Sequence, residues 1–242
     1  NGWAWDDYPF YFSAQTSTFP LFGNVAKFSK SSENKVSVSP NIFKTTIDSL
    51  LNNKIIRNEI NNTFIYNPIK FDIKDTLYVP FKTSKKLTVE LLSQVLNSEV
   101  TYENNNFKFK NVLYSKKIDK TYNAILKSSD NLVAESMLLM IGKKLNNNFS
   151  TSRAINTLKN KWNSWIPDPV IWNDGSGVSR YNMITPRTLV AVLQKIYNKI
   201  GLVGIQKYFA AGGESGTIKD FYKKQGSTYV YAKTGTLKHN HN

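Results

Sequence analysis

The spacing of apolar residues changes character near the middle of the chain. Before about residue 115 they fall in short runs separated by Asn, Pro and Ser clusters, which is typical of β-strands. The segment 84–96 differs, because its apolar residues Leu87, Leu91, Leu92 and Val95 recur at helical spacing. We therefore predict a β-rich region interrupted by one helix. The strands predicted are 25–28, 35–39, 61–66, 76–81, 99–102 and 107–114.

The second half of the chain has a helical period. Ser128–Asp130 separates the first two predicted helices, and these residue types begin helices by accepting backbone hydrogen bonds. Pro186 suits the start of another helix. The division predicts two domains, a partial β-rich one over 1–115 and a mainly helical one over 116–242. The predicted helices are 118–127, 132–145, 152–165 and 188–198, followed by a loop at 212–216 and a strand at 228–233.

Composition narrows the class of protein. The chain has 242 residues, 40% of them hydrophobic, which is enough for a globular core. It has no cysteine and no run of about 20 apolar residues, so we expect neither disulfides nor a transmembrane segment. The formal charge of +15 comes from lysines spread along the chain without a compact basic run. We therefore expect no nucleic-acid partner.

Histidine usage excludes two kinds of catalytic centre. The chain has two histidines, His239 and His241, both within its last four residues. A Ser-His-Asp triad or a histidine-based zinc site needs imidazoles held inside a formed site. We expect no metal and no cofactor, and chemistry run by Ser, Lys, Tyr or carboxylates.

Two short motifs carry candidate chemistry. Lys233-Thr234-Gly235 ends a predicted strand, and Ser129-Asp130-Asn131 stands at the head of a predicted helix. A lysine ammonium and a threonine hydroxyl can bind a carboxylate, and a glycine lets a substrate backbone approach a strand edge. The alternatives are a plain strand-to-turn junction for the first motif and a helix N-cap for the second.

Two other serine patterns are interpreted as non-catalytic. Ser32 and Lys35 form a Ser-x-x-Lys, but in a polar loop, whereas a nucleophile and its lysine need one turn of a buried helix. Asp174-Gly175-Ser176-Gly177 lacks the spacing of a nucleophile elbow and is interpreted as a turn.

Taken together, the motifs carry a family resemblance. Ser-Asp-Asn and Lys-Thr-Gly accompany Ser-x-x-Lys in serine β-lactamases and penicillin-binding proteins. In order and spacing, the chain resembles the class C, DacB-type penicillin-binding proteins, which are D-alanyl-D-alanine carboxypeptidases and endopeptidases. The matching segments are Gly2–Asp7 with Tyr11–Ala14, Lys127–Glu135, Asp174–Asn182 and Ala232–Leu237.

This resemblance implies a fold, an activity and a location. The expected fold class is α+β, a transpeptidase-like antiparallel sheet flanked by helices with a β-rich accessory domain. The expected activity is serine-type hydrolysis of D-Ala-D-Ala stem peptides of peptidoglycan through an acyl-enzyme, outside the cytoplasm or in the periplasm, with inhibition by β-lactams. It also implies that the Ser-x-x-Lys nucleophile and the closing strands are absent from this chain, so that the chain alone is an inactive fragment.

The resemblance assigns six site residues. Three would be catalytic: Ser129 would relay a proton to the leaving amine, Asn131 would bind the substrate amide, and Lys233 would supply positive charge. Three would bind substrate: Thr234 the terminal carboxylate, Gly235 by leaving the strand edge open, and Thr236 through an oxyanion-hole N–H. A catalytically inactive homologue that binds peptidoglycan is the alternative that the sequence leaves open.

Overall fold

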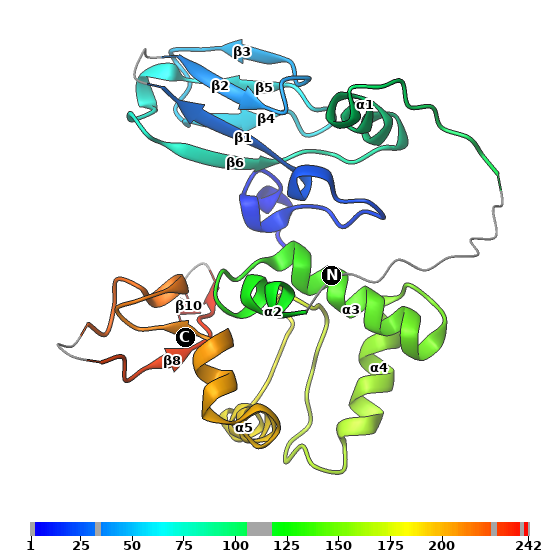
Figure 1. Cartoon of the computed structure of the whole chain (residues 1–242), viewed down its shortest axis with the longest axis vertical. Helices are drawn as coiled ribbons and strands as arrows, with labels where there is room; N and C mark the ends of the chain where they lie inside the picture. The colour runs from blue at the N-terminus through cyan, green and yellow to red at the C-terminus, as the bar shows by residue number, and fades with distance from the viewer. Residues whose placement is uncertain (1–2, 32–34, 106–117, 224–226, 238–239, 242) are drawn as a thin grey trace. The chain divides into compact units, whose positions relative to one another are not determined.

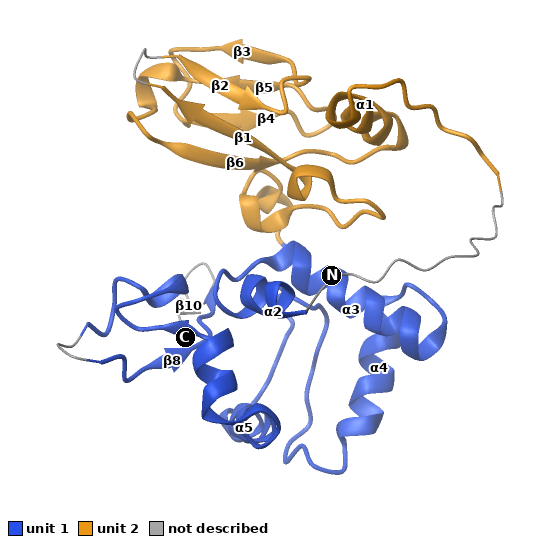
Figure 2. Ribbon diagram, in the orientation of Figure 1, with its two compact units in different colours: residues 1–3, 113–242 blue, residues 4–112 orange. Residues whose placement is uncertain are grey.

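The chain divides into two compact units. The structure, a computed structural model, describes residues 3–31, 35–105, 118–223, 227–237 and 240–241 (Figure 1). Residues 4–112 form one unit, here called the β-rich unit, and residues 1–3 with 113–242 form the other, the helical unit (Figure 2). The predicted boundary between 115 and 116 lies outside the described residues, so the two domains as we drew them stay a prediction.

Two three-stranded sheets build the β-rich unit. In the first, of order β2-β1-β6, β1 pairs antiparallel with both neighbours. In the second, of order β3-β5-β4, β5 is parallel to β3 and antiparallel to β4. The strands are β1 Val25–Lys30, β2 Val36–Ser39, β3 Thr45–Ile47, β4 Ile55–Arg57, β5 Phe64–Tyr66 and β6 Thr76–Pro80, and the short 3-10 helices are Trp5–Asp7, Tyr11–Ser13, Leu21–Asn24 and Pro68–Lys70.

Aromatic side chains fill the core of this unit. Along β1 the side chains alternate, with Ala26 and Phe28 buried and Lys27 exposed, as expected for a strand with one covered face. The ring centroid of Phe28 lies 5.2 Å from that of Phe64, which belongs to the other sheet. Contact between rings of the two sheets therefore joins the sheets into one core.

The predicted helix is present as α1, Lys85–Leu96. Ser84 caps it, because its Oγ accepts a hydrogen bond from the N–H of Leu87 at 3.1 Å. Leu87 and Leu91 are buried, whereas Val95 is 55% exposed, so the buried stripe is shorter than predicted.

Of the two strands predicted after α1, the one at 99–102 was wrong. Those residues are irregular, and the Val100 N–H donates to Ser93 Oγ of α1 at 3.1 Å instead of to a strand. The strand predicted at 107–114 lies outside the described residues.

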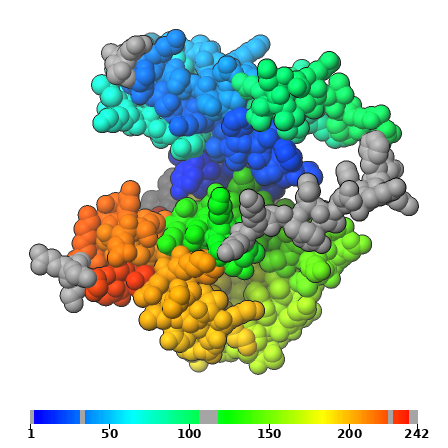
Figure 3. Space-filling view, in the orientation of Figure 1, coloured from blue at the N-terminus to red at the C-terminus, as the bar shows by residue number. Residues whose placement is uncertain are grey.

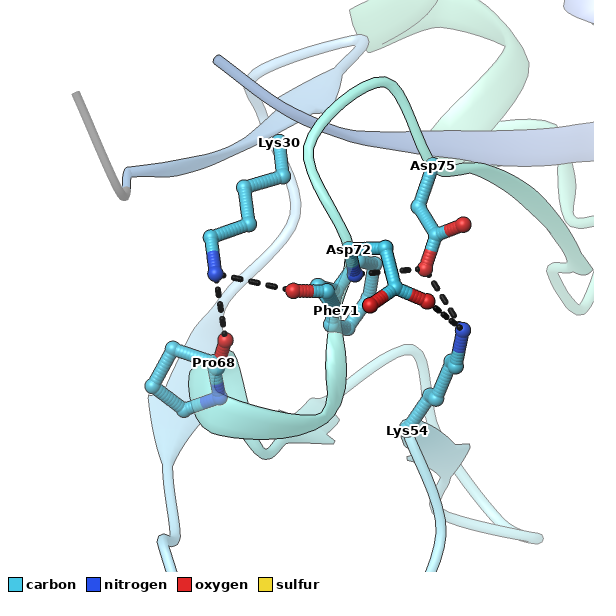
Figure 4. A network of polar contacts seen from close by, with 6 residues as sticks. All are labelled: Lys30, Lys54, Pro68, Phe71, Asp72 and Asp75. Carbon is cyan, nitrogen blue, oxygen red and sulfur yellow. Dashed lines mark hydrogen bonds and ion pairs between the residues drawn. The ribbon is translucent and has the colours of Figure 1, made fainter. Parts of the chain in front are cut away.

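Two lysines hold the loop that precedes β6 (Figure 4). Lys30 donates to the carbonyl oxygens of Pro68 at 3.2 Å and Phe71 at 2.8 Å. Lys54 pairs with the Asp75 carboxylate at 2.6 Å. The same carboxylate accepts the N–H of Asp72, and the bond from Lys54, followed by this one, holds the pKa of Asp75 below its usual value.

Asp75→Asn is expected to reduce the acid sensitivity of the β-rich unit. Because the folded-state pKa of Asp75 is lowered, its interactions stabilise the fold above the unfolded-state pKa of about 4 and are lost as pH falls through the lower folded value. Hydrogen-exchange protection of β1 amides, corrected for intrinsic rates, should therefore change less between pH 7 and pH 3 in the variant than in the wild type. Asp72→Asn is the control, since its contact with Lys54 is longer, at 3.5 Å; equal pH dependence in all three proteins would contradict the prediction.

Helices dominate the second unit. α3 and α4 pack against each other, with Leu138, Ala154 and Ile155 buried between them. Gly142 allows this approach, because a Cβ there would lie 3.1 Å from the Ala154 Cβ. The helices are α2 Asp119–Leu126, α3 Asn131–Asn146, α4 Thr151–Trp162 and α5 Pro186–Tyr208, with a 3-10 helix, η5, at Gly216–Ile218.

α5 is longer than predicted and is interrupted. It begins at Pro186 after the Thr185 cap, and its backbone leaves the helical region at Gly201, where φ is 63°. By length and a mean hydropathy of 1.2 it is the one helix in the described ranges that could cross a membrane, a test that core helices of soluble proteins also pass. Only 11% of its 18-residue apolar stretch is buried. α5 is coloured yellow to orange in Figure 3. Its exposed apolar side chains are Leu189, Val190, Leu193, Tyr197, Leu202 and Val203.

Short strand pairs complete the helical unit. β7 (Ala210–Ala211) pairs antiparallel with β8 (Tyr231–Ala232), and β9 (Thr236–Leu237) with β10 (Asn240–His241). The strand predicted at 228–233 is thus reduced to its two residues in β8. Because the pairing is antiparallel, Lys233, which follows β8, lies beside Phe209, which precedes β7.

Candidate active site

The corner between α2 and α3 carries the first motif. Ser129 has a φ of 57°, in the left-handed region, and the Asp130 N–H can then donate to Ala124 O at 2.9 Å. A residue with a side chain adopts this conformation at a cost of about 1 kcal/mol or more, and the surrounding hydrogen bonds must hold it there. The turn therefore fixes the backbone of Ser129 and, with it, the direction in which its side chain leaves the chain.

Asp130, not Ser129, caps α3. Its carboxylate accepts the N–H of Val133 at 3.0 Å, and Asn131 is the first residue of the helix. The N-cap that the sequence offered as the alternative for this motif is therefore present, and Asp130 provides it. The Ser129 hydroxyl is left to contact another segment.

That segment is the second motif, 104 residues further along the chain. The Lys233 ammonium donates to Ser129 Oγ and to Thr234 O, both at 2.7 Å. Lys233 is an exposed residue, but its ammonium group is partly desolvated by the protein around it. This desolvation lowers the pKa of Lys233 below the usual lysine value. The two motifs therefore meet through a charge-assisted hydrogen bond.

The rest of the second motif is open on one side. Gly235 has no heavy atom within 4 Å of the position that a Cβ would occupy. Thr236 is exposed and belongs to β9, where it pairs with His241. The Thr234 hydroxyl donates to Thr217 Oγ1 at 2.8 Å, a contact that the sequence analysis missed. The open backbone and the adjacent hydroxyls suit an extended, polar ligand.

Asp174 organises a second loop of the helical unit. Asp174 is 4% exposed, and its carboxylate accepts two hydrogen bonds on each oxygen. The donors are Trp3 Nε1 at 2.9 Å, Gly177 N at 2.9 Å, Ser179 N at 2.6 Å and Asn182 Nδ2 at 2.8 Å. The motif Asp174–Gly177 is thus a fixed turn, and Trp3 from the start of the chain belongs to it.

The same turn is held against α3. Glu135 Oε1 accepts both the N–H of Ser176 at 2.8 Å and its hydroxyl at 2.6 Å. A Cβ at Gly175 would lie 2.7 Å from Ala134 O, so the turn contacts the helix backbone itself. Ser176 is therefore occupied by Glu135, which supports the interpretation that it is not a nucleophile. Glu135 lies one helical turn from Asn131.

The arrangement offers an ammonium, hydroxyls and an open strand edge, which can bind an anionic peptide end. Ser32–Asn34 of the formal Ser-x-x-Lys lie outside the described residues, and Lys35 directly precedes β2. Within the described ranges, no three His, Asp or Glu side chains gather in a way that could hold a metal ion.

The fold is that of a penicillin-binding protein. Across 100% of this chain and 60% of the other, it matches the crystal structure of penicillin binding protein 4 (dacB) from Haemophilus influenzae, with a TM-score of 0.75 and 18% identity. A structure of that protein in complex with a β-lactam matches 93% of this chain and 59% of the other, with a TM-score of 0.65 and 17% identity. The predicted α+β fold class is confirmed.

The chain belongs to the D-Ala-D-Ala carboxypeptidase 3 (S13) family, whose model matches residues 83–242. It is 30% identical over 155 residues to penicillin-sensitive carboxypeptidase A of Dictyostelium discoideum. That alignment covers 60% of this chain and 29% of the Dictyostelium protein, so the chain spans less than a third of the length of this relative. The family inferred from the motifs is therefore confirmed.

Proposed function

We propose that this chain is part of a serine-type D-alanyl-D-alanine carboxypeptidase. The observation that carries the proposal is the contact of Lys233 with Ser129, which joins the two motifs into one polar site. Family membership supports it independently. The nucleophilic serine and its lysine would come from polypeptide outside residues 1–242, since the sole Ser-x-x-Lys in the sequence is Ser32–Lys35.

In this proposal the substrate lies along the edge at Gly235. Its terminal carboxylate binds the Thr234 hydroxyl close to the Lys233 charge, and its amide binds the Asn131 side chain. The Thr236 N–H donates to the carbonyl oxygen as negative charge develops there. The open space beside Gly235 supports this placement, because nothing blocks a peptide backbone from the edge.

Ser129 would handle the proton of the leaving group. When the nucleophile attacks the D-Ala-D-Ala carbonyl, the peptide C–N bond breaks and the departing amine must gain a proton. The proton that the nucleophile gives up passes to its lysine; Ser129 donates its hydroxyl proton to the amine nitrogen and regains one from that lysine, while the adjacent Lys233 ammonium stabilises the Ser129 oxygen. Water then hydrolyses the acyl-enzyme. An endopeptidase reaction on cross-linked peptides would use the same groups.

The partners and location follow from this substrate. Stem peptides of peptidoglycan lie outside the cytoplasm. We therefore propose that the enzyme acts outside the cytoplasm, in the periplasm or an equivalent compartment. β-Lactams carry a carboxylate next to a strained amide and would acylate the same nucleophile.

The test uses the full-length gene product and a fluorescent penicillin. We expect covalent labelling of a serine in a Ser-x-x-Lys, at least about tenfold slower in Ser129→Ala because the proton relay is lost. Ser128→Ala is the matched control, since Ser128 is the exposed neighbour and should label like the wild type. A folded full-length protein that takes up no label would instead be the inactive, peptidoglycan-binding homologue.

A further inference from the structure

Thr217 connects the two motifs of the candidate site. Its Oγ1 accepts the hydroxyl of Thr234 at 2.8 Å, and its N–H donates to Lys127 O at 3.2 Å. Lys127 is the C-cap residue of α2, two residues before Ser129, and its carbonyl is one of those that a helix end leaves without an intrahelical partner. One residue of η5 therefore touches both the α2–α3 corner and the Lys-Thr-Gly segment.

The backbone around Thr217 leaves little freedom for this position. Gly216 has a φ of 70°, and a Cβ there would lie 2.7 Å from both Ala210 Cβ and Lys127 O. Only glycine fits this close approach without displacement. The turn thus fixes the backbone position of Thr217, from which its side chain reaches Thr234.

We propose that Thr217 is a positioning residue that acts on substrate through Thr234. A hydroxyl has one proton to donate and can rotate it. When a carboxylate takes the proton of Thr234, Thr217 donates its own proton to Thr234 Oγ1, so that the two hydroxyls form a chain ending on the carboxylate. Hydrogen bonds in such a chain polarise one another, which strengthens the last one. This inference rests on the proposed function and adds a residue to its carboxylate site.

The experiment compares Thr217→Val with Thr217→Ser in the full-length protein. Valine keeps the shape and removes the hydroxyl, whereas serine keeps the hydroxyl. The residue is exposed, so both variants should fold, which thermal unfolding checks. The probes are a penicillin and its methyl ester, which lacks the free carboxylate, and the readout is the second-order rate constant of acylation by intact mass.

We expect Thr217→Val to slow acylation by the free acid about tenfold, mainly through weaker binding, and to leave the rate with the ester nearly unchanged. Thr217→Ser should restore the rate with the free acid to within about twofold. In a cycle with Thr234→Val, the two losses should not add, because both variants break the same chain.

Three results would overturn the assignment while leaving the proposed function intact: an unchanged rate in Thr217→Val, an equal loss with acid and ester, or additive losses in the cycle. Thr217→Ser as slow as Thr217→Val would likewise exclude a role of the hydroxyl. A folded wild type that neither probe acylates would instead overturn the proposed function, and the assignment of Thr217 with it.

Discussion

Lys233→Ala in the full-length protein is expected to slow acylation by penicillin roughly 100- to 1000-fold. The substitution removes the charge beside the carboxylate site and the hydrogen bond to Ser129 in one step. A hydrogen bond to a charged group contributes about 1.5–3 kcal/mol, and the loss of a donor aimed at developing charge costs about 10²–10³ in rate. The measurement is the rate constant of acylation. Thermal unfolding of the same sample checks that the variant is folded, so that a lower rate reports on the site.

The dependence of the acylation rate on pH tests whether the charge of the Lys233 ammonium is required. Because desolvation lowers the pKa of Lys233, the acylation rate should fall on the alkaline side at a pH below the usual lysine range. Lys233→Arg keeps a positive charge at all accessible pH values, so this alkaline fall should move to higher pH even where the rate is lower.

The matched control is Lys223→Ala, an exposed lysine of the same unit that pairs with Asp220 at 3.8 Å. Its acylation rate should equal that of the wild type, because surface ion pairs contribute little. A similar loss in both lysine variants would mean that net charge, not the position of Lys233, controls the reaction.

Asp174→Asn is expected to destabilise the helical unit by several kcal/mol, because the amide leaves two buried donors without an acceptor, at about 1–3 kcal/mol each. The carboxylate accepts two donors on each oxygen, and an amide NH₂ in place of one oxygen would face donors rather than acceptors. Urea unfolding of the 242-residue chain, followed by tryptophan fluorescence, measures this, since Trp3 and Trp172 both hydrogen-bond to Asp174.

Asp220→Asn provides the comparison for this variant. Its carboxylate is 68% exposed and contacts only a surface lysine among the described residues, so its effect should stay below about 0.5 kcal/mol. If the two variants unfolded at the same urea concentration, the Asp174 network would have no special part in holding the turn.

Local order was readable from the sequence where one segment specifies itself. The helix after Ser84 follows from a capping serine and from Leu87 and Leu91 four residues apart, and both features are local. β1 is likewise predicted by residues that alternate over a few positions. The family could be inferred for a related reason, because its motifs keep their order and spacing along the chain.

Where two local alternatives compete, the sequence alone did not decide which one forms. The segment 99–102 has strand-forming residues, but its Val100 N–H bonds to a helix side chain. In the Ser-Asp-Asn motif, Ser and Asp are both good caps, and the pattern could not say that Asp130 takes the role. Local propensity is a weak preference, and the side-chain hydrogen bonds that a segment can make with its neighbours compete with it.

By itself, therefore, the sequence determined the family, the chemical types at the site and most of the helices. The tertiary structure decided which of these groups meet: Lys233 with Ser129, Thr217 with Thr234, and Glu135 with Ser176. The physical reason is that these hydrogen bonds act over about 3 Å, whereas their residues are 104, 17 and 41 positions apart in the chain. Contacts of that kind exist only after the backbone has folded, and no periodicity along the chain records them.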